Sequence, residues 1–220
     1  MAFDEHWEDV FRRRTWGRYP SEELVRLLLP RFPDTEKRKN SRILDLGCGG
    51  GANAWFLARE GFDTYGIDGS PSAIGQAEQL LGREGCKATL AIGDFVVLKY
   101  PDASFDAIVD ANAIQHNTWA DITRCHAEIR RVLKPGGYFF GMLLNDESSG
   151  ADTAEIVELN TYRGFKRGPV GADLLAHLFT RVEVDRLFRG YEELQVERLV
   201  RTMNGGADQA GHFIVVAKKA

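Results

Sequence analysis

Short apolar runs alternate with segments of helical periodicity from residue 42 onward. The apolar runs, each bounded by Gly, Asp or Pro, cover residues 42–46, 63–68, 88–93, 105–111 and 137–144. Between them, apolar side chains recur at helical spacing in residues 52–60, 71–83 and 119–133. Strands that alternate with helices pair in parallel through right-handed crossovers. The pattern therefore predicts an α/β fold, built as an open sheet with helices on both faces.

The N-terminal part of the chain has a different pattern. Residues 3–13 predict a short helix with one apolar face, and Ser21 predicts the N-cap of a second helix. Residues 30–40 are polar, contain two prolines and predict a linker. We therefore expect residues 1–40 to form an N-terminal helical cap.

The C-terminal part is less regular. Residues 146–170 are polar, contain glycine and show no clear period. Residues 171–179 predict a helix, and residues 180–189 and 212–218 predict two closing strands. We expect residues 41–220 to form the main domain, with an insert around residues 146–170.

Composition and charge exclude several function classes. The chain has 220 residues, 44% hydrophobic and 27% charged, which is enough to fold without disulfides or a metal. Lys and Arg total 28 against 32 Asp and Glu, so the net charge of −4 offers no basic field for nucleic acid. Three widely spaced cysteines without a CxxC pair argue against a zinc site and favour a cytoplasmic setting. The N-terminus resembles no secretory signal, and no run of 18 apolar residues predicts a membrane span.

The densest chemical signal is the turn after the first predicted strand, in the sequence LDLGCGGGAN. Glycines at this position expose backbone N–H groups to a ligand, and the following helix N-terminus adds positive potential. Gly47, Gly49 and Ala52 also satisfy the dinucleotide pattern G-x-G-x-x-A, so the turn alone leaves the ligand open. Asp45, just before the turn, would repel a pyrophosphate, whereas it can pair with an ammonium group. Asp68, at the end of the next strand, suits ribose hydroxyls. The ligand is therefore expected to carry a ribose and a cationic, amino-acid-like end.

Five ordered motifs resemble those of the class I S-adenosylmethionine-dependent methyltransferases. They are LDLGCGGG, GIDGSPSAI, AIGDF, FDAIVDANAIQH and EIRRVLKPGGYFF, and together they span about residues 42–144. The resemblance implies a Rossmann-like, mostly parallel sheet of about seven strands with an antiparallel last strand. It implies S-adenosylmethionine as the cofactor and methyl transfer to an acceptor as the activity.

The family's site residues carry over to matching positions in this sequence. By resemblance, the methionine end of the cofactor meets Asp45, Gly47 and Gly49, with Cys48 filling space beside it, and the ribose meets Asp68, Gly69 and Ser70. The adenine meets Asp94 and Phe95, Asp110 and Ala111 lie beneath the methionine, and Gln115 and His116 face the acceptor. Trp16 and Tyr19 either stack on the sulfonium or pack against the core.

The acceptor is less well determined. His116 is the candidate general base, with a loop-shaping hydrogen bond as its alternative role. We expect Arg18, Tyr162 and Arg163 to bind a small anionic acceptor such as a sugar or a nucleotide-linked sugar, modified on oxygen or nitrogen. No N/D-P-P-Y/F run occurs, which argues against adenine-N6 DNA methylation. A non-catalytic cofactor-binding sensor and a nicotinamide-dependent oxidoreductase remain alternatives, and the oligomeric state is left open.

Overall fold

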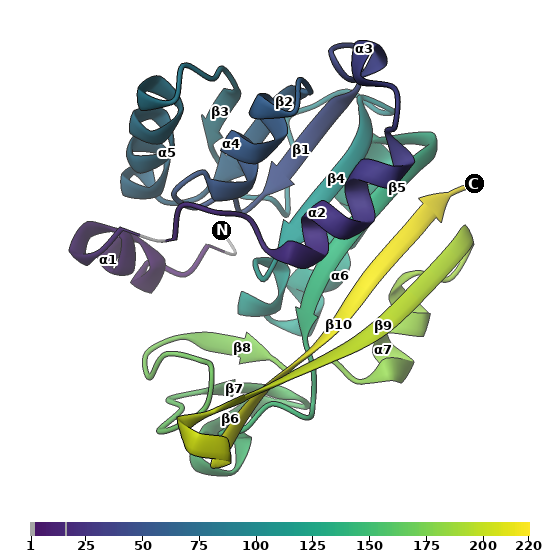
Figure 1. Cartoon of the computed structure of the whole chain (residues 1–220). Helices are drawn as coiled ribbons and strands as arrows, with labels where there is room; N and C mark the ends of the chain where they lie inside the picture. The colour runs from purple at the N-terminus through teal and green to yellow at the C-terminus, as the bar shows by residue number, and fades with distance from the viewer. Residues whose placement is uncertain (1–2, 16) are drawn as a thin grey trace.

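A twisted, mostly parallel sheet forms the centre of the molecule (Figure 1). The computed structural model describes residues 3–15 and 17–220. Within these residues the main sheet has seven strands in the order β3-β2-β1-β4-β5-β10-β9. β3, β2, β1, β4 and β5 pair in parallel, whereas β10 runs antiparallel to both β5 and β9. The strands are β1 (Arg42–Leu46), β2 (Asp63–Asp68), β3 (Thr89–Ile92), β4 (Phe105–Ala111), β5 (Leu133–Leu144), β9 (Tyr191–Met203) and β10 (Asp208–Lys219). The predicted fold is confirmed.

Helices cover both faces of this sheet, as predicted. Because side chains of a strand alternate between faces, Ile43 and Val109 contact one helical layer and Leu44 and Ile108 the other. The first layer consists of α2 (Glu22–Leu28), α4 (Ala52–Arg59) and α5 (Pro71–Arg83). The second consists of α6 (Trp119–Val132) and α7 (Arg181–Leu187). Short helical turns join the elements: η1 (Leu29–Arg31), α3 (Thr35–Arg38), η2 (Ile114–His116), η3 (Ala151–Thr153) and η4 (Asn204–Gly206).

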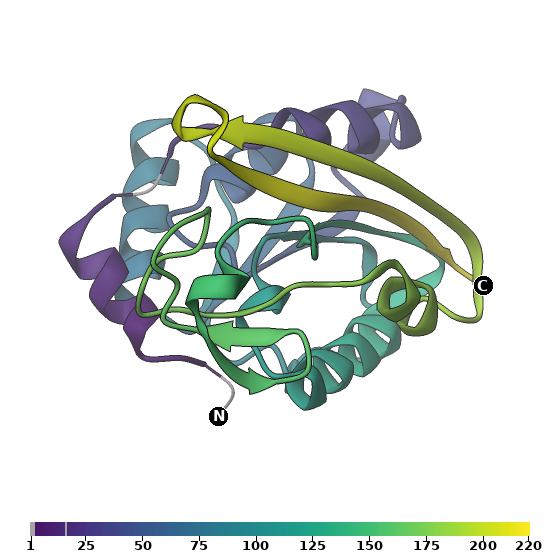
Figure 2. The same ribbon diagram turned by 90° about the horizontal axis from the view of Figure 1, so that it is seen from below.

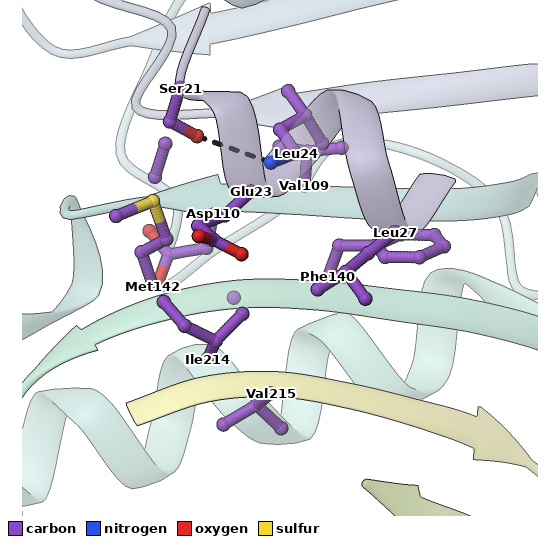
Figure 3. A pocket seen from close by; sticks show the side chains of 12 residues that line it. Ser21, Glu23, Leu24, Leu27, Val109, Asp110, Phe140, Met142, Ile214 and Val215 are labelled. Carbon is purple, nitrogen blue, oxygen red and sulfur yellow. Dashed lines mark hydrogen bonds between the residues drawn. The ribbon is translucent and has the colours of Figure 1, made fainter. Parts of the chain in front are cut away.

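Helix α2 begins at the predicted N-cap and packs closely on the sheet. The Oγ atom of Ser21 accepts a hydrogen bond of 3.3 Å from the backbone N–H of Leu24. Leu24 and Leu27 then lie over β4, β5 and β10, where a cavity of only about 10 Å³ remains (Figure 3). Such a volume holds at most about one water molecule, so α2 belongs to the core.

A small second sheet and the N-terminal helix lie at one end of the main sheet (Figure 2). The small sheet is antiparallel and contains β6 (Glu155–Glu158), β7 (Thr161–Arg163) and β8 (Leu175–His177). Helix α1 (His6–Arg13) packs Trp7 and Val10 against a buried cluster that includes Phe165, Val170 and Leu174. Side chains of the predicted N-terminal cap and of the predicted insert around residues 146–170 therefore pack into one apolar cluster.

Three local predictions were wrong. The helix predicted at 171–179 is the strand β8, and the strand predicted at 180–189 is the helix α7. The side chains of Thr180 and Glu183 form a reciprocal capping box that starts α7, and Val184 and Leu187 are buried at helical spacing. The linker predicted at 30–40 contains the short helix α3. No helix in the described ranges is both long and apolar enough to span a membrane.

Candidate functional site

The Gly-rich turn joins β1 to α4 in a conformation that requires glycine. Gly47 and Gly51 have φ values of 63° and 87°, which L-residues rarely adopt. A Cβ on Gly51 would lie 2.7 Å from the Cβ of Ala77, and a Cβ on Gly47 would overlap the side chain of Ala113. The turn therefore contacts α5 on one side and the loop after β4 on the other, without any side chain of its own between them.

Asp68 closes this turn from the neighbouring strand. Its two carboxylate oxygens each accept a hydrogen bond of 2.9 Å, one from the N–H of Gly49 and one from the N–H of Ser70. Burial raises the pKa of Asp68, while the two backbone hydrogen bonds oppose that effect. The carboxylate is thus held rigidly at the end of β2 and lines the main cavity.

Two further carboxylates are buried beneath the site on opposite faces of the sheet. Asp45 is fully buried and receives a 3.3 Å hydrogen bond from Asn53, while Asp110 accepts from the N–H groups of Ala113 and Ile114. The Oδ2 atom of each carboxylate has no hydrogen-bond partner among the described residues. Burial raises the pKa of each to about 7. Such an orphaned buried oxygen is expected where a cationic group completes the site.

One cavity of about 600 Å³ lies above these groups. Ten of the predicted residues line it: Tyr19, Gly47, Cys48, Gly49, Asp68, Gly69, Phe95, Ala111, Gln115 and His116. Of the other predicted residues within the described part of the chain, seven do not: Arg18, Asp45, Ser70, Asp94, Asp110, Tyr162 and Arg163. Trp16 lies outside the described residues. The cavity therefore gathers the residues of the Gly-rich turn with those of the loop after β4.

His116 lies in this loop with one ring nitrogen fixed. Its Nδ1 atom is 2.7 Å from the carbonyl oxygen of Leu175, which can only accept, so Nδ1 carries the proton. Burial lowers the pKa of His116 to about 4 and keeps the ring neutral at pH 7. Nε2 then has a lone pair with no partner among the described residues. The ring of Trp7 packs edge-on against it, with the ring centroids 4.7 Å apart. The hydrogen bond at Nδ1 agrees with the loop-shaping role predicted for His116, whereas the lowered pKa makes the ring a weak general base that offers an acceptor at Nε2.

The basic residues predicted to bind an anion are engaged elsewhere. Arg18 forms an ion pair of 2.6 Å with Glu84, and Arg163 forms one of 2.8 Å with Asp4. Tyr162 packs against Phe165 within the cluster under the small sheet. The geometry thus gives no support to a shared anion site at these three positions.

Asp94 does not line the cavity. Its Oδ1 atom accepts a 3.1 Å hydrogen bond from the N–H of Val96, which shapes the turn after β3. The neighbouring Phe95 lines the cavity in its stead. Tyr19 lies at the cavity mouth, 69% exposed, with its ring edge-on to Trp55 at 5.8 Å. This exposure disagrees with the predicted packing of Tyr19 against the core, whereas its place in the cavity lining agrees with the role beside the cofactor.

Helix α1 closes one side of the cavity, in agreement with the predicted N-terminal cap, although its docking contacts were not predicted. Phe3, Trp7 and Phe11 line the cavity at i, i+4 and i+8. Glu8, on another side of the helix, accepts hydrogen bonds from Ser70 and Ser72 at the start of α5. The apolar spacing predicted the helix, whereas its docking partners are more than 60 residues away in sequence.

Comparison with known proteins shows which family the chain is similar to. A family described as "Methyltransferase domain" matches residues 43–137, which contain the Gly-rich turn, Asp68 and the loop of His116. A sterol 24-C-methyltransferase of Aspergillus fumigatus is 35% identical over 105 residues, covering 46% of this chain and 27% of that protein. A SAM-dependent methyltransferase structure from Methanosarcina mazei superposes with a TM-score of 0.67 at 25% identity, over 81% of this chain and 92% of that one.

Residues 43–137 therefore match a methyltransferase-domain family, and the chain is similar to class I S-adenosylmethionine-dependent methyltransferases. The resemblance predicted from the five motifs is thus confirmed, and it indicates S-adenosylmethionine as the cofactor. A ubiquinone biosynthesis O-methyltransferase of Sinorhizobium fredii is also similar, at 29% identity over 130 residues, which is 59% of this chain and 52% of that protein. The chain thus spans about half or less of the length of these two curated relatives.

Proposed function

We propose that this chain transfers the methyl group of S-adenosylmethionine to a small molecule bound in the same cavity. The observation that carries the proposal is that one cavity is lined both by the Gly-rich turn with Asp68 and by Gln115 with His116. Methyl transfer needs donor and acceptor together, because the acceptor atom has to approach the methyl carbon from the side opposite sulfur.

The residues at the first end fit the cofactor. The orphaned Oδ2 atom of Asp45 lies beneath the turn and suits the ammonium group of the methionine end. Asp68 keeps lone pairs for the ribose hydroxyls beyond its two backbone hydrogen bonds. Phe95 offers an apolar wall to the adenine. When bound, S-adenosylmethionine supplies an electrophilic methyl group on a sulfonium.

His116 positions the acceptor at the second end. Its Nε2 lone pair accepts a hydrogen bond from the acceptor's O–H or N–H and aims that atom into the cavity. His116 would hold the acceptor atom facing the methyl group, which the sulfonium would supply with the bonding electron pair remaining on sulfur. A pKa near 4 makes His116 a weak base at neutral pH, so we assign it the role of orienting the acceptor. The acceptor's own proton leaves to solvent, because methylation makes the acceptor atom more acidic.

The walls around the acceptor end favour an apolar body over the sugar that we predicted from sequence. Trp7, Met142, Leu144, Val170 and Leu174 line the cavity there. One curated relative is named for a sterol, which agrees with an apolar acceptor at this site. A reducing, cytoplasmic setting remains part of the proposal because the three cysteines are free thiols.

Calorimetry with S-adenosylhomocysteine tests the donor end. Asp68→Asn should weaken binding by about 1–3 kcal/mol, because it removes the carboxylate that pairs with buried hydroxyls. Asp63→Asn is the matched control, since Asp63 lies at the other end of β2 and its side chain is 42% exposed. Binding of NAD in place of S-adenosylhomocysteine, or equal affinities of the two variants, would contradict the proposal.

A further inference from the structure

The β9–β10 hairpin forms one edge of the main sheet (Figure 1), and three of its residues line the cavity. His212 pairs with Leu144 across β10 and β5, and Arg201 pairs with Ala210 across β9 and β10. All four residues line the cavity. Neighbouring strands are about 4.8 Å apart, so Arg201 lies two strand spacings, roughly 10 Å, sideways from the strand of Leu144.

Arg201 differs from the other arginines near the site. Arg18, Arg163 and Arg198 each pair with a carboxylate. Arg201 is exposed at the cavity and forms no ion pair with any carboxylate in the described ranges. Arg14 also lines the cavity and already interacts within the protein. A guanidinium without a partner at a cavity mouth is a ready anion site, since it presents a planar fork of donors.

The other charged groups of the cavity do not compete for this role. The carboxylate of Asp4 is held by Arg163, and that of Asp68 by two backbone N–H groups. Burial, followed by the charge of Arg201, lowers the pKa of His212 to about 4, so this ring is neutral at pH 7. The cavity therefore has an unneutralised positive charge at Arg201 on its acceptor side.

Between His116 and Arg201 the lining is apolar except for the neutral ring of His212. Leu144, Val170 and Leu174 form this stretch, and the small side chain of Ala210 leaves the approach to Arg201 clear. A ligand that places its reactive atom at His116 and an anionic group at Arg201 has to cover this surface with an apolar body about two strands wide.

We propose that Arg201 binds the anionic group of the methyl acceptor, and that the acceptor is an acid with an apolar, ring-sized body. The assignment rests on the proposed methyltransferase function. It replaces Arg18 and Arg163 as the anion-binding residues, and it gives the hairpin a part in acceptor selection.

The test uses two probes of the same shape, 2-naphthoate and its neutral analogue 2-naphthamide, with the full chain saturated with S-adenosylhomocysteine. Calorimetry should show naphthoate binding about tenfold more tightly than naphthamide, as expected for a charge-assisted contact at a partly exposed site. Arg201→Gln should abolish that preference and leave the affinity for naphthamide unchanged. Arg198→Gln is the control, because Arg198 lies on the same strand but pairs with Glu147, and it should keep the preference.

The outcomes separate this assignment from the function on which it rests. Wild-type protein that binds S-adenosylhomocysteine but fails to bind naphthoate, or that binds both probes equally, overturns the assignment and leaves the methyltransferase proposal standing. A preference that survives in Arg201→Gln overturns it as well. Failure of the wild-type chain to bind S-adenosylhomocysteine would instead contradict the proposed function.

Discussion

Glu8 is the side chain whose removal should release helix α1 from the cavity. Its carboxylate accepts hydrogen bonds of 2.5 Å from Ser70 Oγ, 2.7 Å from Ser72 Oγ and 3.2 Å from Ser72 N. These groups surround the first turn of α5, where a negative charge is favoured. At a partly exposed site each bond contributes about 1 kcal/mol, so Glu8→Ala should lower the free energy of local opening by about 2–3 kcal/mol.

Limited trypsin digestion measures this opening directly. Arg12, Arg13 and Arg14 lie at the end of α1 and are already exposed, but trypsin can cleave after them only when the helix undocks and unfolds locally. If opening and closing are faster than cleavage, loss of the N-terminal fragment should be about 30- to 150-fold faster in Glu8→Ala than in the wild type. Asp9→Ala is the matched control, because Asp9 is exposed on the same helix and its only ion pair among the described residues is with Arg12, at 3.9 Å. Equal cleavage rates for the two variants would refute the idea that Glu8 holds the helix.

The pH dependence of the opening of α1 has a defined sign. The hydrogen bond from Ser70 is the largest effect that lowers the pKa of Glu8, which falls from 4.5 to about 2. A carboxyl group with a lowered pKa in the docked state stabilises docking fully above pH 4.5, and this contribution is lost as the pH falls toward 2. Opening of α1 in the wild type should therefore be constant from neutral pH to about 5 and increase below that.

Two further predictions concern the core of the site. Because burial raises the pKa of Asp45 to about 7, binding of S-adenosylhomocysteine at pH 6.5 should release most of a proton as the ammonium group approaches, which calorimetry in buffers of different ionisation enthalpy detects. Asp45→Asn should abolish this release, and an unchanged release would assign the proton to another group. Gly51→Ala should cost about 1–3 kcal/mol more in urea unfolding than Gly61→Ala, because both glycines have positive φ but only the new methyl at position 51 meets Ala77. Equal losses would mean that α5 yields to the methyl at little cost.

The central sheet could be predicted because its signals are local. Strands such as 42–46 and 105–111 are short apolar runs between turn residues, and the helix over residues 71–83 begins at Pro71 behind the capping residue Ser70. The segment 171–189 could not be assigned from periodicity alone, because its apolar positions fit both a strand and a helix. The capping box of Thr180 and Glu183 was the readable signal that the periodicity obscured.

The residues of the site also fall into those that local sequence signals predict and those that they do not. Gly47, Gly49 and Asp68 could be predicted because each directly follows or ends a strand, and strand ends meet at one edge of a parallel sheet. The state of an arginine depends instead on partners far along the chain. Arg163 is paired with Asp4, 159 residues away, so its positive charge in the sequence did not indicate an anion site.

The contact between Gly47 and Ala113 makes the donor and acceptor halves of the site a single mechanical unit. A Cβ at position 47 would overlap the side chain of Ala113, so no slack exists between the turn after β1 and the loop after β4. A displacement of the turn therefore shifts Ala113 and the loop that contains His116, three residues further along the chain. An engineer who transplants a new acceptor loop into this scaffold must therefore keep a residue no larger than alanine at position 113. A bulkier residue there would change cofactor affinity before it changed acceptor choice.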